Sequence, residues 1–113
     1  MKIQKSIKYY TNRDIKREYW HKENDTLYWH REDGPAYIRY WDTGEKEREE
    51  WWVADKLHKL DGPAYIVYNS DGTAIYEKYY INGEKMSKEE WEDHPLRQDY
   101  IIKEAIKEAM EEL

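Results

Sequence analysis

Short runs in which apolar and polar residues alternate, separated by turn residues, fill most of the chain up to residue 83. Residues 35–41 and 46–54 are two such runs, and residues 42–45 (DTGE) supply turn chemistry between them. Side chains of a strand point alternately to its two faces, and a short polar connection with Gly joins antiparallel neighbours. The pattern therefore predicts a β-hairpin over residues 35–54.

The hairpin sequence is repeated. HREDGPAYIRY begins at His30, and HKLDGPAYIVY begins at His58, 28 residues later. The second copy has strand-like runs at 63–68 and 73–81, and it closes on Asn82-Gly83, a strong hairpin dipeptide. Residues 9–20 form a weaker, earlier copy. Self-similarity at this period indicates stacked repeats, so we expect about three hairpins in units of about 1–26, 27–54 and 55–83.

The repeat also predicts which face of the sheet is packed. One face of the first full copy carries Ala36, Ile38 and Tyr40, and the second copy repeats the same three residue types. The opposite face, which carries Tyr37 and Trp41, changes between the copies. We expect the unchanged face to be buried and the changing face to be free.

The DGPA phrase is expected to be a corner. Aspartate caps turns, glycine adopts a positive φ easily, and proline fixes φ at the start of the next strand. A histidine three residues earlier is placed to pin the incoming chain. The eight corner residues are His30, Asp33, Gly34, Pro35, His58, Asp61, Gly62 and Pro63. A metal site formed by the two histidines and the two aspartates is the alternative, and the turn chemistry favours the structural interpretation.

The repeat ends before residue 87. Ser87 and Glu90 form a capping box, which predicts a short helix over 88–93. Pro95 fits the first turn of a second helix that runs to residue 112. Its apolar positions have helical spacing, and they are Ile102, Ala105, Ile106, Ala109, Met110 and Leu113. We expect one mainly β domain, with a repeat sheet over 1–86 and a helical cap over 87–113, and the apolar stripe to be buried on the sheet or on another molecule, including a second copy.

Composition narrows the class of protein. The chain has no cysteine and no phenylalanine, but it has 12 Tyr and six Trp. The lack of cysteine favours a reducing compartment. No run approaches the ~20 apolar residues of a membrane helix, and the first residues do not resemble a signal peptide. We therefore expect a soluble, cytoplasmic protein. No nucleophile elbow, phosphate loop or thiolate metal motif occurs, and we expect neither an enzyme nor a cofactor.

Charge and aromatic residues suggest the binding chemistry. The net charge is −6, yet residues 1–22 hold seven Lys and Arg against two acids. A net negative charge disfavours nucleic acid as the partner. Acidic and aromatic residues gather in one part of the repeat, and they predict a protein-binding face made of Trp41, Glu45, Glu47, Glu49, Glu50, Trp51, Trp52 and Tyr80. The alternatives are an acidic mimic of nucleic acid that blocks a nuclease, and a metal- or carbohydrate-binding module.

The segment LHKLDGPAYIVYNSDGTAIYEKYYINGEK and its weaker twin carry a resemblance. They resemble the DGPA repeats of small proteins from bacteriophages, bacteria and large DNA viruses, which are similar to MORN-type β-hairpin repeats. The resemblance covers about half of the chain and leaves out the last helix. It implies an elongated antiparallel sheet and binding as the activity. Taken with the acidic, aromatic face, it leads us to expect a phage-type or antitoxin-type inhibitor that occludes a partner protein.

Overall fold

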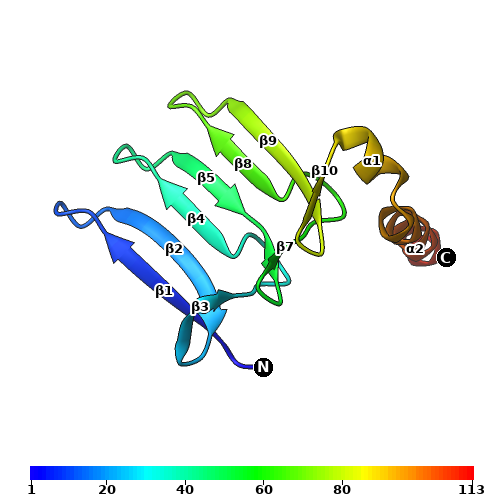
Figure 1. Ribbon diagram of the computed structural model, residues 1–113, viewed down its shortest axis with the longest axis horizontal. Coiled ribbons are helices and arrows are strands. Elements are labelled where there is room, and N and C mark those ends of the chain that lie inside the picture. The colour runs from blue at the N-terminus through cyan, green and yellow to red at the C-terminus, as the bar shows by residue number, and fades with distance from the viewer.

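The computed structural model describes all 113 residues. It contains ten strands and two helices, which follow one another along the chain (Figure 1). The strands are β1 (Ile3–Tyr9), β2 (Ile15–Lys22), β3 (Asp25–Trp29), β4 (Tyr37–Tyr40), β5 (Lys46–Glu50), β6 (Trp52–Val53), β7 (Lys56–Leu57), β8 (Tyr65–Tyr68), β9 (Ala74–Ile81) and β10 (Glu84–Met86). The helices are α1 (Lys88–Asp93) and α2 (Pro95–Glu111).

The strands build one long antiparallel sheet in chain order. Its path is β1-β2-β4-β5-β8-β9-β10, with β3 paired to β2, and β6 and β7 form a separate two-stranded ladder. Three hairpins, β1/β2, β4/β5 and β8/β9, lie side by side with their turns at the same edge (Figure 1). The expected fold class is confirmed: a mainly β sheet of antiparallel hairpins followed by a helical cap.

Each unit also has a short return hairpin that begins where its second strand ends. The pairs are β2/β3, β6/β7 and β9/β10. Their turns place non-glycine residues at positive φ: Asn24 at 66°, Ala54 at 50°, Asp55 at 63° and Asn82 at 50°. Tight turns of this hand match the right-handed twist of the flanking strands. The sequence predicts a turn at Asn24-Asp25 and the hairpin turn at Asn82-Gly83, but not the turn at Ala54-Asp55.

The three main hairpins share one irregularity. In each hairpin the second strand carries one extra residue near the turn, and these residues are Lys16, Glu47 and Ile75. An extra residue of this kind is a β-bulge, which bends the strand and re-aims the neighbouring side chains. The hairpins therefore repeat in detail, and the bulge gives each of them the same curvature.

Buried residues lie on both faces of the sheet, and not on one face only. Ala36 and Ala64 are completely buried, as the packed-face prediction requires. Tyr37, which was predicted to lie on the free face, is only 2% exposed. That prediction is wrong because Trp29, at the end of β3, folds over this face and stacks on the Tyr37 ring, with 4.9 Å between ring centroids and 16° between planes. Both faces of the sheet are thus partly covered.

The helical cap begins as predicted. The Ser87 side chain accepts from the Glu90 backbone N–H, and the Glu90 carboxylate accepts from the Ser87 backbone N–H, which is the reciprocal capping box. Trp91 of α1 is 4% exposed and packs on Tyr79, with ring centroids 4.8 Å apart. Its indole N–H donates to the Lys59 carbonyl at 2.9 Å. Trp91 therefore closes the end of the last unit.

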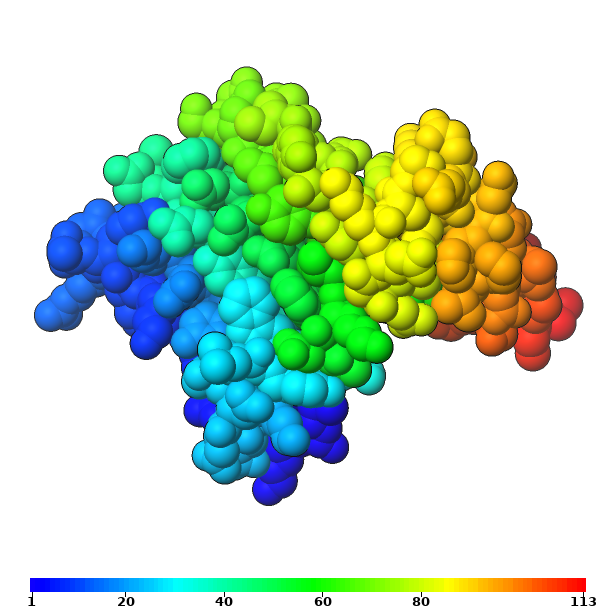
Figure 2. Space-filling view, in the orientation of Figure 1, coloured from blue at the N-terminus to red at the C-terminus, as the bar shows by residue number.

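Helix α2 leaves the sheet after α1 and buries none of its residues (Figure 2). Of the two expected locations for its apolar stripe, the sheet is excluded, and another molecule stays a prediction. Ile102, Ile106 and Met110 are 57%, 55% and 66% exposed. Neither helix combines the length and the apolar character that crossing a bilayer requires.

Candidate functional site

The corner histidines hold the return turns. The Nδ1 atom of His30 accepts from the backbone N–H of Ala54 at 2.7 Å, and Nδ1 of His58 accepts from that of Asn82 at 2.9 Å. Each histidine thus binds a turn 24 residues further along the chain. Burial lowers the pKa of His58, so its neutral form, which can accept this bond, is favoured. Both histidines were expected to pin the incoming chain at the corner; the structure shows that they instead accept hydrogen bonds from the return turn 24 residues later.

The next residue of each corner is a cation that lies on a tryptophan of the same sheet. The Arg31 guanidinium is 3.8 Å from the centroid of the Trp20 ring, and the Lys59 ammonium is 3.8 Å from that of Trp51. Such cation–π contacts are attractive, with larger values when the pair is desolvated. The two DGPA corners therefore fasten neighbouring units in the same way.

The corner glycines do not adopt a positive φ, and they are approached closely by the ends of neighbouring cationic side chains. Neither Gly34 nor Gly62 is among the positive-φ residues, which corrects the sequence prediction. A Cβ at Gly34 would lie 2.7 Å from Cζ of Arg31, and one at Gly62 would lie 3.3 Å from Nζ of Lys59. Glycine lets the cation cross the corner to reach its tryptophan.

The aspartates of the corners stay near solvent. Asp33 binds Nε of Arg31 at 3.0 Å, and this partner lowers the pKa of Asp33. Asp61 lies 3.9 Å from the Lys59 ammonium. No group of three or more His, Cys, Asp or Glu side chains lies close enough to hold a metal ion. The corners connect neighbouring units, and their side chains do not form the ligand cluster that the metal alternative requires.

Between the two corners runs a shallow groove. Its lining includes Arg31, Trp51, Val53 and Leu60, and Tyr100 of α2 reaches one side of it. The groove is open to solvent, and its polar side chains are engaged in the corner contacts described above. Most of its lining residues belong to the two corners, so the groove lies at the joint between units.

The residues expected to form one acidic, aromatic face do not share a surface. Glu49 and Glu50 are consecutive on β5 and point to opposite faces of the sheet. Glu49 is buried and accepts from the hydroxyl of Tyr68 at 2.6 Å. Glu50 is buried on the other face, where it accepts from the Trp52 indole N–H at 3.1 Å. Burial raises the pKa of Glu50, against the opposing effects of Trp52 and Arg48.

The remaining members of the predicted face are dispersed as well. Glu47 accepts from Nε of Arg39 at 2.7 Å, and Glu45 is exposed in the turn after Trp41. The indole nitrogen of Trp41 is buried without a hydrogen-bond acceptor, for which we have no physical account. Tyr80 is half-buried on β9. Most of the predicted carboxylates therefore neutralise cations or accept from neighbouring side chains of their own sheet, and the single acidic face is not formed.

A cationic row takes its place. Residues opposite one another on β1, β2, β4 and β5 are all basic, and we call this set the cationic row: Lys8, Arg17, Arg39 and Arg48. Sequence reasoning missed it because the members are far apart in the chain and their alignment depends on the bulges. The excess of Lys and Arg in residues 1–22 was the only sequence signal.

Tyr37 lies at the centre of the cationic row. Burial raises the pKa of its hydroxyl, but the guanidinium groups of Arg39, Arg17 and Arg48 outweigh that effect and lower it. The Arg48 guanidinium also lies 5.0 Å from the centroid of the Tyr37 ring. A buried tyrosine thus gathers three arginines on one face of the sheet.

Two surfaces are thus incompletely satisfied within the chain: the apolar stripe of α2, and the Lys8 and Arg17 end of the cationic row, whose members form no salt bridge. No protein-family model, no curated protein and no solved structure matches the chain.

Proposed function

We propose that the protein is a non-enzymatic protein-binding module that engages its partner with the apolar stripe of α2. The observation that carries the proposal is the exposure of Ile102, Ile106 and Met110 on a helix with no buried residue. An amphipathic helix of this kind lays its apolar side into a groove of another protein. Removing these side chains from water supplies roughly 25 cal/mol per Å² of apolar surface.

The charges beside the stripe define the groove that it fits. Lys103 and Lys107 each follow a stripe residue by one position, so they line one edge of the stripe, and both are exposed. Lys103 pairs with Asp99 at 2.8 Å, whereas Lys107 has no salt-bridge partner. The complementary surface is an apolar groove with carboxylates along one rim, because opposite charges at the rim of an interface guide docking.

The attachment of the cap supports this role because it leaves the apolar stripe of α2 facing solvent, although Tyr100 of α2 reaches the groove between the corners. Trp91 fixes the start of the cap, and the Arg97 guanidinium lies 4.2 Å from its ring centroid. A partner whose working surface received α2 would be occluded, which is the inhibitory role expected from the resemblance to phage and bacterial DGPA-repeat proteins. A second copy of the chain is the competing occupant.

The test begins with the full-length chain as bait. A captured protein is produced in pure form, and its dissociation constant is measured by calorimetry against three versions of the chain. These are the wild type, the stripe variant Ile106→Glu/Met110→Glu, and a control that adds two carboxylates at exposed positions away from α2, Thr26→Glu in β3 and Ser70→Glu in a turn. The stripe variant should bind at least about tenfold more weakly, because central apolar anchors carry most of an interface's energy. The control should bind like the wild type.

Two results would overturn the proposal. Equal affinity of the stripe variant and the wild type would show that α2 is not the binding element. Light scattering that finds a wild-type dimer and a monomeric stripe variant would show that the stripe is covered by a second copy.

A further inference from the structure

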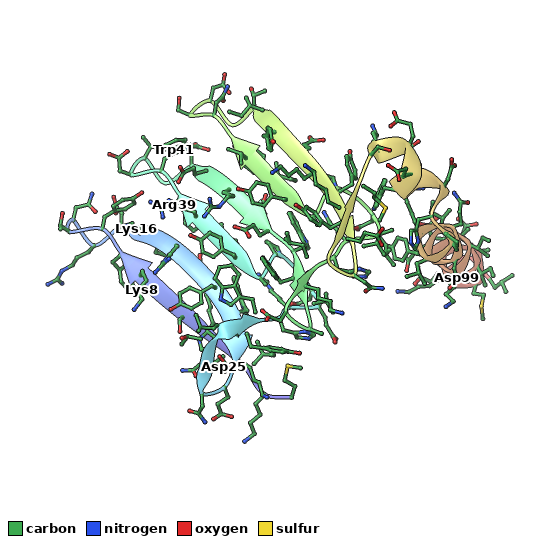
Figure 3. The ribbon with its side chains drawn as sticks, in the orientation of Figure 1. Lys8, Lys16, Asp25, Arg39, Trp41 and Asp99 are labelled. Atoms are coloured by element: carbon green, nitrogen blue, oxygen red, sulfur yellow. The ribbon has the colours of Figure 1, made fainter.

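The structure assigns a second docking surface, independent of α2: the cationic row receives an acidic segment of a protein. The row lies on one face of the sheet near the turns of the first two hairpins. Figure 3 labels Lys8 and Arg39 of the row, together with Lys16 and Trp41, over the same two hairpins.

The register of the sheet fixes the spacing of the charges. Lys8 is opposite Arg17, Arg17 is opposite Arg39, and Arg39 is opposite Arg48. Neighbouring strands are about 4.8 Å apart, so the row presents four cations over about 14 Å. An extended peptide of four to five residues spans that length at about 3.3 Å per residue.

The row is electrostatically unfavourable on its own. Like charges directly opposite one another on neighbouring strands destabilise a sheet. Two carboxylates offset part of the repulsion: Glu47 lies 2.7 Å from Arg39, and Glu50 lies 3.1 Å from Arg48. Lys8 and Arg17 have no carboxylate partner within salt-bridge distance. An anionic ligand would therefore gain most at the end of the row formed by the first hairpin.

The bulges make the first hairpin more basic than the others. Lys16 occupies the bulge position that Glu47 holds in the second hairpin and Ile75 holds in the third. The first hairpin thus adds a cation where the second adds a carboxylate. Beyond Arg48 the row continues with Val67 and Tyr76, which carry no positive charge. The surface is polarised, with a cationic end and an apolar end.

The arginines are arranged for carboxylates. A guanidinium donates two parallel hydrogen bonds to one carboxylate, which makes the pair both strong and directional. Arg39 and Arg48 are only partly exposed, with 32% and 33% of their side chains accessible. Their contacts with Tyr37 restrict them before any ligand arrives, which lowers the conformational entropy lost on binding.

A short acidic peptide fits this surface better than a nucleic acid strand. Residues 23–113 hold 12 Lys and Arg against 23 Asp and Glu, so most of the molecule around the row is acidic. A long strand of phosphates would extend past the row onto that acidic surface and be repelled. A peptide with three or four carboxylates is short enough to lie entirely within the row.

The test uses the protein with all 113 residues and, as the probe, a fluorescent peptide of four glutamates, which matches the length of the row, with anisotropy as the readout at low salt. The variant Lys8→Gln/Arg17→Gln removes the two unpaired cations of the row. The matched control Lys56→Gln/Lys85→Gln removes two exposed cations from β7 and β10. We expect at least about a fivefold loss of affinity in the row variant only, in line with the strength of charge-assisted hydrogen bonds. Because Arg17 contacts Tyr37, the single exposed reversal Lys8→Glu, with Lys85→Glu as its control, repeats the comparison without disturbing the core.

The outcomes separate the alternatives. A selective loss in both row variants, and a wild-type affinity that falls as salt rises, support the assignment. Equal losses in row and control variants would show that only the net charge matters and would overturn it. Tighter binding of an eight-nucleotide thymidylate strand than of the glutamate peptide would also overturn it, in favour of a nucleic acid ligand. No binding of the peptide to the wild type at millimolar concentration would overturn it as well. None of these outcomes involves α2, so the result is independent of the proposed function.

Discussion

The hydroxyl of Tyr68 donates a hydrogen bond of 2.6 Å to Glu49 of the preceding hairpin. The same contact occurs one unit earlier, where Tyr40 donates to Glu18 at 2.8 Å. Both carboxylates are buried, and each also contacts a lysine ammonium. Neighbouring hairpins are therefore joined by a repeated side-chain bond in addition to the backbone ladder, and the two glutamates hold the sheet together.

Removing one of these hydroxyls should weaken the sheet. Tyr68→Phe and Tyr40→Phe each leave a buried carboxylate with one acceptor site unpaired, so we expect a loss of about 1.5 to 3 kcal/mol in the free energy of unfolding. Tyr76→Phe is the control, because Tyr76 is exposed. Urea denaturation measures the three values. A loss in the control as large as that in the two variants would contradict the assigned role.

The hydrogen bond between Tyr40 and Glu18 should make the free energy of unfolding depend on pH in the alkaline range. Burial and the neighbouring Glu18 raise the pKa of Tyr40 from 10.0 to about 12. A raised folded-state pKa contributes stability that is complete below pH 10 and is lost as the pH rises toward 12. The free energy of unfolding should therefore fall between these values, and less steeply in Tyr40→Phe than in the wild type. Identical slopes in the two proteins would show that another group is responsible.

His58 should make stability sensitive to acid. Burial lowers its pKa below the ordinary value of 6.5, so the folded state favours the neutral ring. The corresponding stability is present above pH 6.5 and is lost as the pH falls through the lower folded-state pKa. Protonation also places a hydrogen on the Nδ1 atom that accepts from Asn82. Urea titrations at pH 7.5 and 5.5 test this. His58→Phe should lower the free energy of unfolding at pH 7.5, and the difference between its values at the two pH conditions should be smaller than in the wild type. An unchanged difference would refute this.

Trp91 should determine whether the helical cap stays on the sheet. It is buried, packs on the tilted ring of Tyr79 and donates to the Lys59 carbonyl. Trp91→Ala removes the ring contact and the hydrogen bond and should cost about 3 to 5 kcal/mol, the usual range for a buried tryptophan. Hydrogen exchange should show lost protection first in β9, β10 and α1. Exchange that stays slow in β9 would mean that the cap does not close the last unit.

Much of the fold follows from local sequence. The DGPA phrase, the Asn82-Gly83 turn and the Ser87 capping box each specify their own geometry, and each was predicted within a few residues. The sequence repeat also predicts the order of the hairpins in the sheet, because adjacent copies of one supersecondary unit stack on each other. These features need no knowledge of distant contacts.

The missed features depend on contacts between distant segments. The return turn at Ala54-Asp55 places two residues at positive φ, and neither alanine nor this dipeptide marks such a turn. Tyr37 is buried because Trp29 crosses the sheet face, a contact that strand alternation does not reveal. Gly34 gives room to Arg31, which a φ-based argument overlooks.

The candidate surfaces were harder to predict than the fold. The acidic residues around Glu49 looked like a binding face, but alternation sends neighbours to opposite sides and cations of the same sheet neutralise them. The cationic row needs the register of four strands, which the bulges set. The stripe of α2 was predicted correctly, yet its exposure could be known only from where the cap attaches.

The central claim is that the hairpins are joined in the same way at each repeat, and hydrogen-bond scalar couplings in a ¹³C,¹⁵N-labelled sample test it most directly. Ala36 should donate to Glu50 and accept from Trp20, and Ala64 should donate to Lys78 and accept from Trp51. The account predicts couplings across these four bonds and slow exchange of both alanine amides. Fast exchange at either alanine, or couplings to other partners, would contradict it.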